Sequence, residues 1–440
     1  MTAVMTTAST TRAVVRDRLA PRRRVCLGLV TVAVGLTAAP SAWAAWSPAV
    51  TLGTTASTPQ PAPQAAANAA GNAAVVWVDG GVVRAAGRSP AGTWATPVAL
   101  SPAAETASAP AIAVRSDGSA IALWAATRAS DTVIESATRS ATGAWTTPTV
   151  LSAAGATAQS PQVAVDAAGN ATAVWATGTM NVVSSTQAPG QAWTAPQALS
   201  TAATGAIYNL HLAVSPSGAA VVGWSTGAAT RPHSGNVVTR PAGGRFGAPV
   251  TLVTSGGRPI QDALGSFTVA IDSTGHATAA WDTAYAYAAS QQPGGAWGAP
   301  VQLAPAAYAS YVSLAVNATG TAVAVWNDPN GLDSASRPGS GAWTPAVTIN
   351  PTADIYPGAA LAANGTTTFM AADNLTPTPR PVTGSTWTPA GGWSAPTTLD
   401  RLTSVYGYTA TSVAPLGQGA LAAWTNAGTS QATIRVSTAG

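Results

Sequence analysis

An all-β ring of eight four-stranded repeats is the fold that this sequence predicts, from three observations. Fourteen of the 16 tryptophans fall into two columns, one inside each repeat and one near its end. Successive copies lie 45 to 57 residues apart, close to the length of a four-stranded propeller blade. The last copy lacks its fourth segment, and an isolated fourth segment stands near the start of the chain. We therefore expect an eight-bladed β-propeller whose last blade is closed by the N-terminal strand.

The first 44 residues have the pattern of an export signal and are set apart from the fold. Arginines at 16, 18 and 22–24 precede an apolar run from Val25 to Ala39, and Ala42-Trp43-Ala44 provides small residues at a cleavage site. That run is shorter than the roughly 20 residues that a membrane-spanning helix needs. We expect a signal peptide at 1–44 and one secreted propeller domain at 45–440, with no membrane attachment after cleavage. The pattern leaves Sec and twin-arginine export open.

Each copy opens with two short β segments joined by a tight turn. The first is apolar, as in Gln162–Val165, and the second alternates small and large residues up to a tryptophan, which is typical of strands buried on both faces. Between them an Asn or Asp precedes a glycine by three positions. This spacing is typical of a tight hairpin turn, in which the polar side chain caps the turn and the glycine adopts a positive φ. These pairs are Asn68 and Gly71, Asp166 and Gly169, Asp272 and Gly275, and Asn317 and Gly320.

The two tryptophan columns mark the second and fourth segments. The first column holds Trp77, Trp124, Trp175, Trp224, Trp281, Trp326 and Trp424, with Ala371 in its place once. The second column holds Trp46, Trp94, Trp145, Trp193, Trp297, Trp343 and Trp393, with Phe246 in its place once. Such strict recurrence favours core packing over sugar stacking for these indoles.

The fourth segment begins at the second-column tryptophan and carries a proline before a Leu or Ile. Proline cannot donate to a strand ladder, so this segment should be the outer edge strand. The last copy reaches Gly440 after its third segment, while Trp46-Ser-Pro48-Ala-Val-Thr-Leu52 has no copy of its own. Pairing the two would close the ring.

The turn Val163-Ala-Val-Asp166-Ala-Ala-Gly169-Asn170 resembles that of NHL-type blades, and the copies as a whole resemble secreted bacterial β-propeller repeats. The resemblance covers nearly all of 45–440. Its motif is a turn signature, so it implies a fold and a tendency to bind other molecules without naming a ligand.

Composition removes several classes of function. Outside the leader there are 13 arginines and no lysine against 14 acidic residues, which leaves no basic surface for nucleic acid or anionic membranes. The sole cysteine, Cys26, lies in the leader, so thiol chemistry and disulfides are excluded. His211, His233 and His276 lack metal-ligand spacing. We expect no metal and no cofactor.

Catalytic patterns are weak. The copies are sialidase-like blades without the sialidase Ser-x-Asp-x-Gly-x-x-Trp turn, because the tryptophan follows the glycine by six residues instead of three. Glycoside hydrolysis usually needs two carboxylates, and the two glutamates outside the leader, Glu105 and Glu135, have no recognisable partner. Residues 327–333, Asn-Asp-Pro-Asn-Gly-Leu-Asp, alternate oxygens as a calcium loop does, but an ordinary turn explains them better.

The distribution of tyrosine singles out a candidate site. All eight tyrosines fall in connections between copies or after the second segment, and none in the first three full copies. If the first segments line a central channel, both loop classes share one face of the ring. Tyrosine rings stack on sugars and carboxylates accept hydroxyl hydrogen bonds, although plain packing is an equal alternative. The predicted ligand-binding residues are Tyr285, Tyr287, Tyr308, Tyr311, Tyr356, Tyr408, Asp282 and Asp328.

The sequence thus favours a secreted, monomeric, non-catalytic binding or scaffold propeller with an extracellular or cell-wall carbohydrate as ligand. A glycan-directed hydrolase or lyase acting on the same face and a purely structural surface protein are the alternatives.

Overall fold

A computed structural model describes most of the chain from residue 45 onward. The described residues are 45–56, 62–129, 131–153, 155, 157–178, 181–200, 205–228, 231–254, 264–304, 309–329, 331–350, 355–365, 367–374, 379–402, 411–427 and 431–440. The chain divides into two units, 1–41 and 42–440. The predicted signal peptide at 1–44 lies outside the described residues. None of the described residues forms a helix that could cross a membrane.

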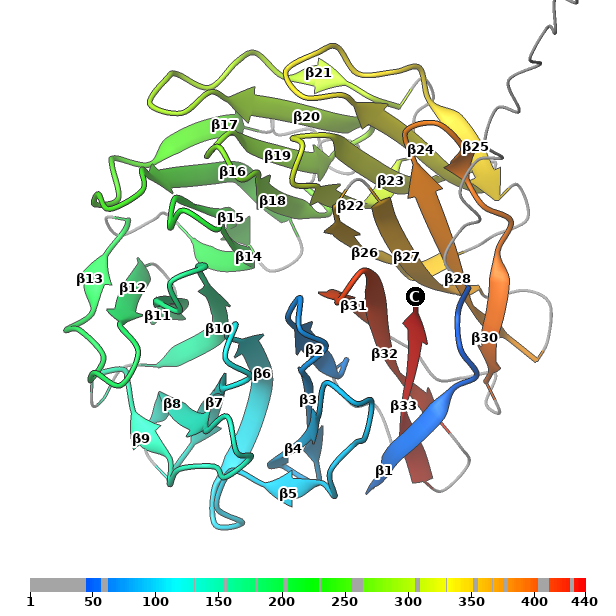
Figure 1. The fold of residues 1–440 in the computed structure, drawn as a ribbon. Helices are drawn as coiled ribbons and strands as arrows, with labels where there is room; N and C mark the ends of the chain where they lie inside the picture. Colours follow the sequence, from blue (N-terminus) through cyan, green and yellow to red (C-terminus); the bar gives the residue numbers. More distant parts are fainter. Residues whose placement is uncertain are drawn as a thin grey trace, which may run out of the picture. The chain divides into compact units, whose positions relative to one another are not determined.

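The propeller unit is all-β, and eight antiparallel sheets stand around a central axis (Figure 1). The innermost strands are apolar and carry no Asp, Glu, Lys or Arg. They are β2 (Gln64–Ala67), β6 (Thr106–Val114), β10 (Ala158–Val165), β14 (Ala206–Val214), β18 (Phe267–Ile271), β22 (Ser310–Val316), β26 (Ile355–Asn364) and β31 (Thr411–Leu416).

The second strands run outward from these and contain the first tryptophan column. They are β3 (Ala73–Asp79), β7 (Ala120–Thr127), β11 (Ala171–Thr177), β15 (Ala220–Ala228), β19 (Ala277–Asp282), β23 (Ala322–Asp328), β27 (Thr367–Asn374) and β32 (Gly419–Ala427). The third strands are β4 (Val82–Arg88), β8 (Thr132–Arg139), β12 (Asn181–Gln187), β16 (Arg231–Arg240), β20 (Ala286–Gln291), β24 (Gly331–Arg337), β28 (Pro381–Thr388) and β33 (Gln431–Ala439).

The outermost strands are short, in keeping with the prolines that precede them. They are β5 (Val98–Ala99), β9 (Thr149–Val150), β13 (Gln197–Ala198), β17 (Val250–Thr254), β21 (Val301–Gln302), β25 (Val347–Asn350), β29 (Gly392–Trp393) with β30 (Thr397–Arg401), and β1 (Val50–Ala56). We number the blades by their innermost strands, so that β2 opens blade 1 and β31 opens blade 8. The eight-bladed propeller predicted from the repeats is confirmed.

The N-terminal strand completes the last blade, as predicted. β1 pairs antiparallel with β33, from Val50 opposite Val436 to Ala56 opposite Gln431. Trp46 then packs against blade 7: its ring meets Phe369 edge-on at 6.3 Å, and a Cβ added at Gly384 would lie 2.6 Å from the indole. The ring is therefore closed by non-covalent contacts of the first described strand.

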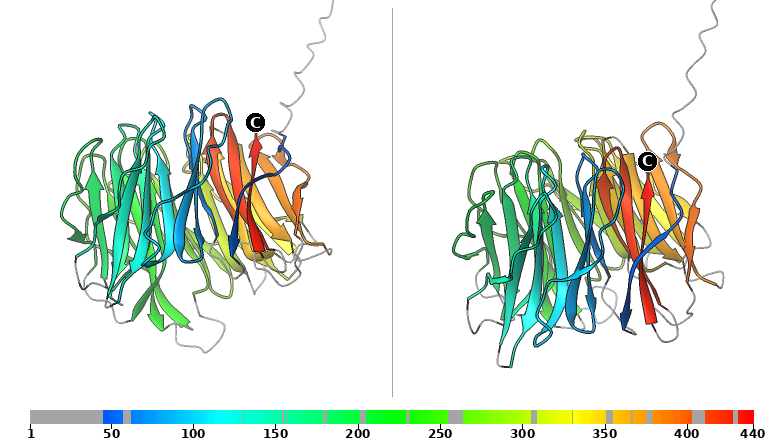
Figure 2. Two further views of the ribbon diagram at one scale, coloured as in Figure 1. Left: turned by 90° about the horizontal axis from the view of Figure 1, so that it is seen from below. Right: turned by 60° about the horizontal axis from the view of Figure 1, so that its bottom comes forward.

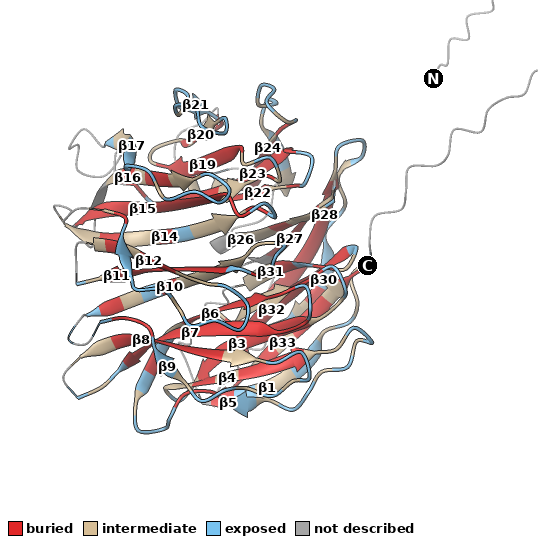
Figure 3. Ribbon diagram, turned by 60° about the vertical axis from the view of Figure 1, so that its left-hand side comes forward, coloured by how far each residue is buried: buried red, intermediate tan, exposed pale blue. Residues whose placement is uncertain are grey.

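The core lies between the blades and is formed mainly by the second and third strands (Figure 3). All seven first-column tryptophans are at most 2% exposed. In blade 7 the predicted substitute Ala371 is wrong by one residue. In blade 3, Val163 pairs with Ala173, and Trp175 follows Ala173 by two residues. In blade 7, Leu361 pairs with Met370 in the same way, so the residue equivalent to the tryptophan is Ala372.

The ring has two faces, and each is formed by different connections between strands (Figure 2). On the hairpin face, turns join each innermost strand to the second strand; Asn68–Asn72 is the first of them, and β33 ends there. On the loop face lie the connections between blades and the loops after the second strands. Both loop classes lie on one face, as expected. The prediction that the tyrosines fall in these loops is wrong for four of them: Tyr208, Tyr311 and Tyr356 lie near the loop-face ends of β14, β22 and β26, and Tyr287 lies in β20.

Candidate functional site

The residue that follows the first-column position is apolar in three blades and polar in five. It lies at the loop-face end of the second strand: Val78, Ala125 and Ala176 in blades 1–3, and Ser225, Asp282, Asn327, Asp373 and Thr425 in blades 4–8. In a ring of equivalent repeats, a side chain that the fold requires recurs in every blade. Polarity confined to blades 4–8 is therefore not required by the architecture.

The seam between blades 4 and 5 is joined by Asn209, which the polar residue of blade 4 supports. Ser225 is completely buried, and Asn209 donates from Nδ2 to its Oγ at 3.1 Å within the same blade. The same amide donates to the carbonyl oxygen of Gly265, the residue two positions before β18, at 3.4 Å. Asn209 thus connects the loop-face ends of the innermost strands of blades 4 and 5.

Asp282 does the same between blades 5 and 6, and it is only 3% exposed. Its Oδ1 accepts hydrogen bonds from the Ser266 hydroxyl, from the Ser266 amide at 3.1 Å and from the Val312 amide at 3.4 Å. Burial raises the pKa of Asp282 to about 6, although these hydrogen bonds oppose the shift. The carboxyl therefore changes charge just below neutral pH, in the boundary between blades 5 and 6.

Tyr311 occupies a strained backbone position beside Asp282. Its φ is +55°, inside a bulge of β22, and Ala109, Ser160 and Asn209 adopt φ of 47° to 53° at the equivalent place in blades 2, 3 and 4. Because the conformation recurs, it belongs to the blade and not to a particular function. What distinguishes blade 6 is the half-exposed phenol ring carried at this point.

Blade 5 carries a row of stacked aromatic rings that ends on the loop face. Phe267 stacks on Trp281 at 5.9 Å, Trp281 on Tyr287 at 6.1 Å, and Tyr285 meets Tyr287 edge-on at 6.4 Å. Tyr287 packs on the apolar cluster facing blade 4 and Tyr285 on the one facing blade 6, so each ring is partly buried. Both tyrosines contribute to packing and keep one side exposed.

The structure brings four of the eight predicted site residues together. Asp282, Tyr285, Tyr287 and Tyr311 share the loop face of blades 5 and 6. Tyr356 lies in β26, but its side chain is outside the described residues, as are Tyr308 and Tyr408 entirely. The binding assignment of these residues stays a prediction.

Asp328, the eighth predicted residue, meets another carboxyl group. The β23–β24 hairpin brings it close to Asp333, which is 4% exposed. Burial, and then the Asp328 carboxyl, raise the pKa of Asp333. The described part of the chain contains no group of three or more His, Cys, Asp or Glu residues that could hold a metal ion.

A carboxylate pair in blade 2 was missed from the sequence. Arg128 donates from Nε to Glu105 at 2.8 Å and from Nη2 to Glu135 at 2.5 Å, and Trp124 donates to Glu135 at 3.0 Å. The prediction that the glutamates lack a partner is wrong, because Arg128 joins residues that are far apart in sequence. A correct strand register would have placed Trp124 opposite Glu135 on adjacent strands, and this is the one signal in the sequence that could have indicated a partner for Glu135.

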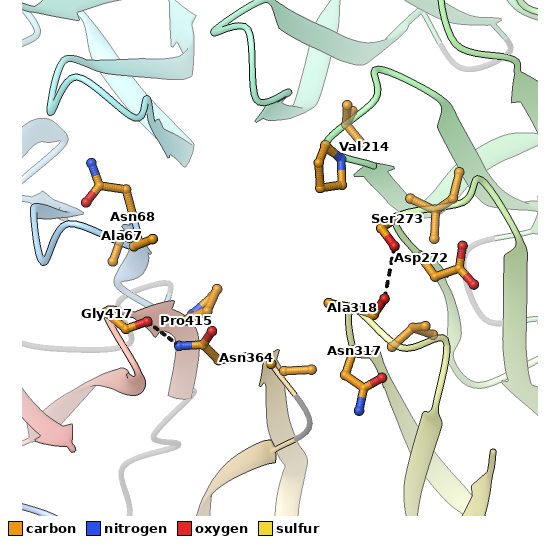
Figure 4. Close-up of a pocket in the computed structure, with 16 residues that line it drawn as sticks. Ala67, Asn68, Val214, Asp272, Ser273, Asn317, Ala318, Asn364, Pro415 and Gly417 are labelled. Carbon is orange, nitrogen blue, oxygen red and sulfur yellow. Dashed lines mark hydrogen bonds between the residues drawn. The ribbon is translucent and has the colours of Figure 1, made fainter. Parts of the chain in front are cut away.

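A cavity of about 360 Å³ opens at the hairpin face of the channel (Figure 4). Most of its polar walls serve the turns: the Oδ1 atoms of Asn68, Asp272 and Asn317 cap their own turns, whereas Nδ2 of Asn317 is buried without a hydrogen-bond partner. Asn364 donates to the Gly417 carbonyl at 2.6 Å, and Ser273 to the Ala318 carbonyl at 2.9 Å. These side chains hold the turns in place, so the loop face remains the better candidate.

The fold is similar to that of several proteins of known structure. No family model and no curated protein matches the chain. An ulvan lyase of polysaccharide lyase family PL25, bound to GlcA(1-4)Rha3S, is similar over 88% of this chain and 95% of its own, at 10% identity and a TM-score of 0.52.

Two further solved structures are similar at lower scores. A Penicillium chrysogenum α-L-arabinanase complexed with arabinobiose matches 67% of this chain and 98% of its own, at 12% identity and a TM-score of 0.42. YCF48 bound to D1 peptide matches 75% and 93%, at 15% identity and a TM-score of 0.45. At such identities a likeness shows the fold alone.

Proposed function

We propose that the protein is a secreted, non-catalytic propeller that binds an extracellular or cell-wall carbohydrate on its loop face. The observation that carries this proposal is the confinement to blades 4–8 of the tyrosines and of polar residues directly after the first-column position. Ligand pockets combine aromatic walls with a few placed polar groups, and this half of the loop face offers both. The ulvan lyase, a propeller of similar fold, acts on a glycan, which is compatible with the proposal.

A glycan-directed hydrolase or lyase on the same face is the second candidate, favoured by the raised pKa of Asp282. A general acid with such a pKa could donate a proton near neutral pH. Asp282 is nevertheless 3% exposed, and its Oδ1 already accepts hydrogen bonds from Ser266 and Val312. Glu105 and Glu135 are held by Arg128. Binding therefore accounts for these residues better than catalysis does.

A glycan array probed with the protein beginning at residue 45 tests the proposal and gives a ligand for further work. Substitution of Tyr311 by Ala should then weaken binding by roughly 1–3 kcal/mol in calorimetry, the scale of removing an aromatic anchor. Alanine fits this backbone position, because Ala109 holds it in blade 2. Ser160→Ala, at the same bulge in blade 3, should leave the affinity unchanged.

The outcomes separate the candidates. Binding that survives Tyr311→Ala unchanged would move the ligand away from this face. Release of shorter products from a bound glycan would show that the protein is a hydrolase or lyase. An array without any hit would favour a purely structural surface protein.

A further inference from the structure

Arginines at the ends of third strands join neighbouring blades on the hairpin face. They stand in four blades: Arg88 in blade 1, Arg139 in blade 2, Arg240 in blade 4 and Arg337 in blade 6. Arg337 donates to Thr278 Oγ1 at 2.9 Å and to the Ser290 hydroxyl, both in blade 5. Arg240 donates to Thr172 Oγ1 in blade 3 at 3.0 Å. Each of these guanidinium groups is held by the preceding blade.

Neighbouring carboxylates and close packing complete these contacts. Asp272 stabilises the charge of Arg337 and Asp166 that of Arg240, in both cases against the burial that lowers the pKa of the arginine. Arg139 lies flat on Gly87 of blade 1, where an added Cβ would approach its Nε to 2.7 Å. All three arginines therefore act as structural clamps between blades.

Arg88 and Arg139 each donate to a glycine carbonyl of their own blade, Arg88 to Gly71 at 2.8 Å and Arg139 to Gly118 at 3.2 Å. Arg88 differs from Arg139 in lining a cavity. In the preceding blade, Leu421 stands where blades 3 and 5 have a threonine, and the shortened turn after β31 contains Gly417 and Gln418 instead of an aspartate. Burial lowers the pKa of Arg88, and no carboxylate opposes that shift. At these two positions blade 8 thus has neither the threonine hydroxyl nor the aspartate that blades 3 and 5 provide.

The space left by the short turn is a cavity of about 490 Å³ at the seam where the ring closes. Its walls include Trp46, Arg88, Gln418 and Thr438; no Asp or Glu side chain lines it, and the negative charge nearby is the carboxylate of the last residue, Gly440. Arg88 is half-buried, so it is partly desolvated but still accessible from the cavity. A cation in such a setting attracts an anion more strongly than a fully hydrated one does.

We propose that this cavity binds an anionic group, a carboxylate or a sulfate, through Arg88. A guanidinium presents its N–H donors in a planar fork that matches two oxygens of such a group. The cavity lies on the hairpin face, so this site is separate from the loop-face site of the proposed function. Among carbohydrates its chemistry selects acidic glycans: uronic acids or sulfated sugars. The amide of Gln418 and the hydroxyl of Thr438 border the same space and can take sugar hydroxyls.

The experiment compares a tetragalacturonate with its fully methyl-esterified form, and both with sodium sulfate, by calorimetry on the protein beginning at residue 45. The acid should bind, the ester should not, and sulfate should compete with the acid. Arg88→Gln should weaken binding of the acid by about tenfold or more, the scale of a lost charge-assisted pair. Arg139→Gln, the matched variant in blade 2, should leave affinity within about twofold and lower the melting temperature.

Equal affinities for the unsubstituted protein and Arg88→Gln would overturn the inference, as would equal binding of acid and ester. Absence of binding to either anion would overturn it too, whereas glycan-array hits that depend on Tyr311 would still support the proposed function. If sulfate binds through Arg88 and no glycan binds anywhere, the anion site stands and the carbohydrate function fails.

Discussion

Asp282 is a buried carboxyl group that makes the stability of the boundary between blades 5 and 6 depend on pH. Its pKa of about 6 in the folded protein lies above the value of about 3.9 in an unfolded chain. Between these values the folded state binds the extra proton, so this group favours folding at low pH. That contribution is fully present below about pH 4 and is lost as the pH rises through about 6.

We therefore expect the unfolding free energy of Asp282→Asn, relative to that of the unsubstituted protein, to increase as the pH rises. Asparagine keeps an oxygen for the Ser266 and Val312 donors but does not titrate. The difference in unfolding free energy between the variant and the unsubstituted protein should grow by up to about 3 kcal/mol between pH 4 and 7.5. Urea unfolding at several pH values measures it, and parallel curves would show that Asp282 is not the titrating group.

Gly384 is a second residue with a checkable role, because its missing Cβ makes room for Trp46. Gly384→Ala should press a methyl group against the indole and lower the unfolding free energy by about 1–3 kcal/mol. Gly247→Ala is the control, since its nearest neighbour would be the Thr239 carbonyl at 3.8 Å. Equal melting temperatures for the two variants would mean that Trp46 does not seal blades 7 and 8.

At the scale of elements, β1 carries the closure of the ring. Thr54 faces Thr433 in the β1–β33 ladder, and paired residues of antiparallel strands bring their Cα atoms within disulfide range. Cysteines at both positions, in protein beginning at residue 45, have no competing thiol because Cys26 is absent. We expect an intramolecular disulfide that raises the unfolding free energy by roughly 3–5 kcal/mol.

Each single-cysteine variant serves as the control for that pair. Disulfide-linked dimers on a non-reducing gel would show instead that the strand is supplied by another copy. Two unreacted thiols would show that β1 does not lie beside β33.

The whole ring was predictable to the extent that it repeats. The tryptophan columns and the complementary ends at Trp46 and Gly440 follow from periodicity, which is visible in one sequence. Departures from the repeat were harder to predict. The Glu105–Arg128–Glu135 contacts depend on strand register, and the cavity beside Arg88 depends on a turn shortened in blade 8. The misplaced Ala371 had the same cause, since blade 7 also has a short turn.

The candidate site was predictable in chemistry but not in geometry. Tyrosine distribution indicated the loop face of the later blades. It could not indicate that Asp282 is buried in a seam with Ser266, or that Tyr287 stacks on Trp281, because alternation along a strand does not reveal which neighbour a side chain meets at a blade boundary.

Hydrogen–deuterium exchange with and without a glycan found on the array tests the central claim most directly. Our account predicts protection of backbone amides at the loop face of blades 4–6, in residues 205–210, 264–266, 282–286 and 309–312. The equivalent segments of blades 1–3, such as 106–110 and 157–161, should exchange at unchanged rates. Protection confined to blades 1–3, or spread evenly around the ring, would contradict it.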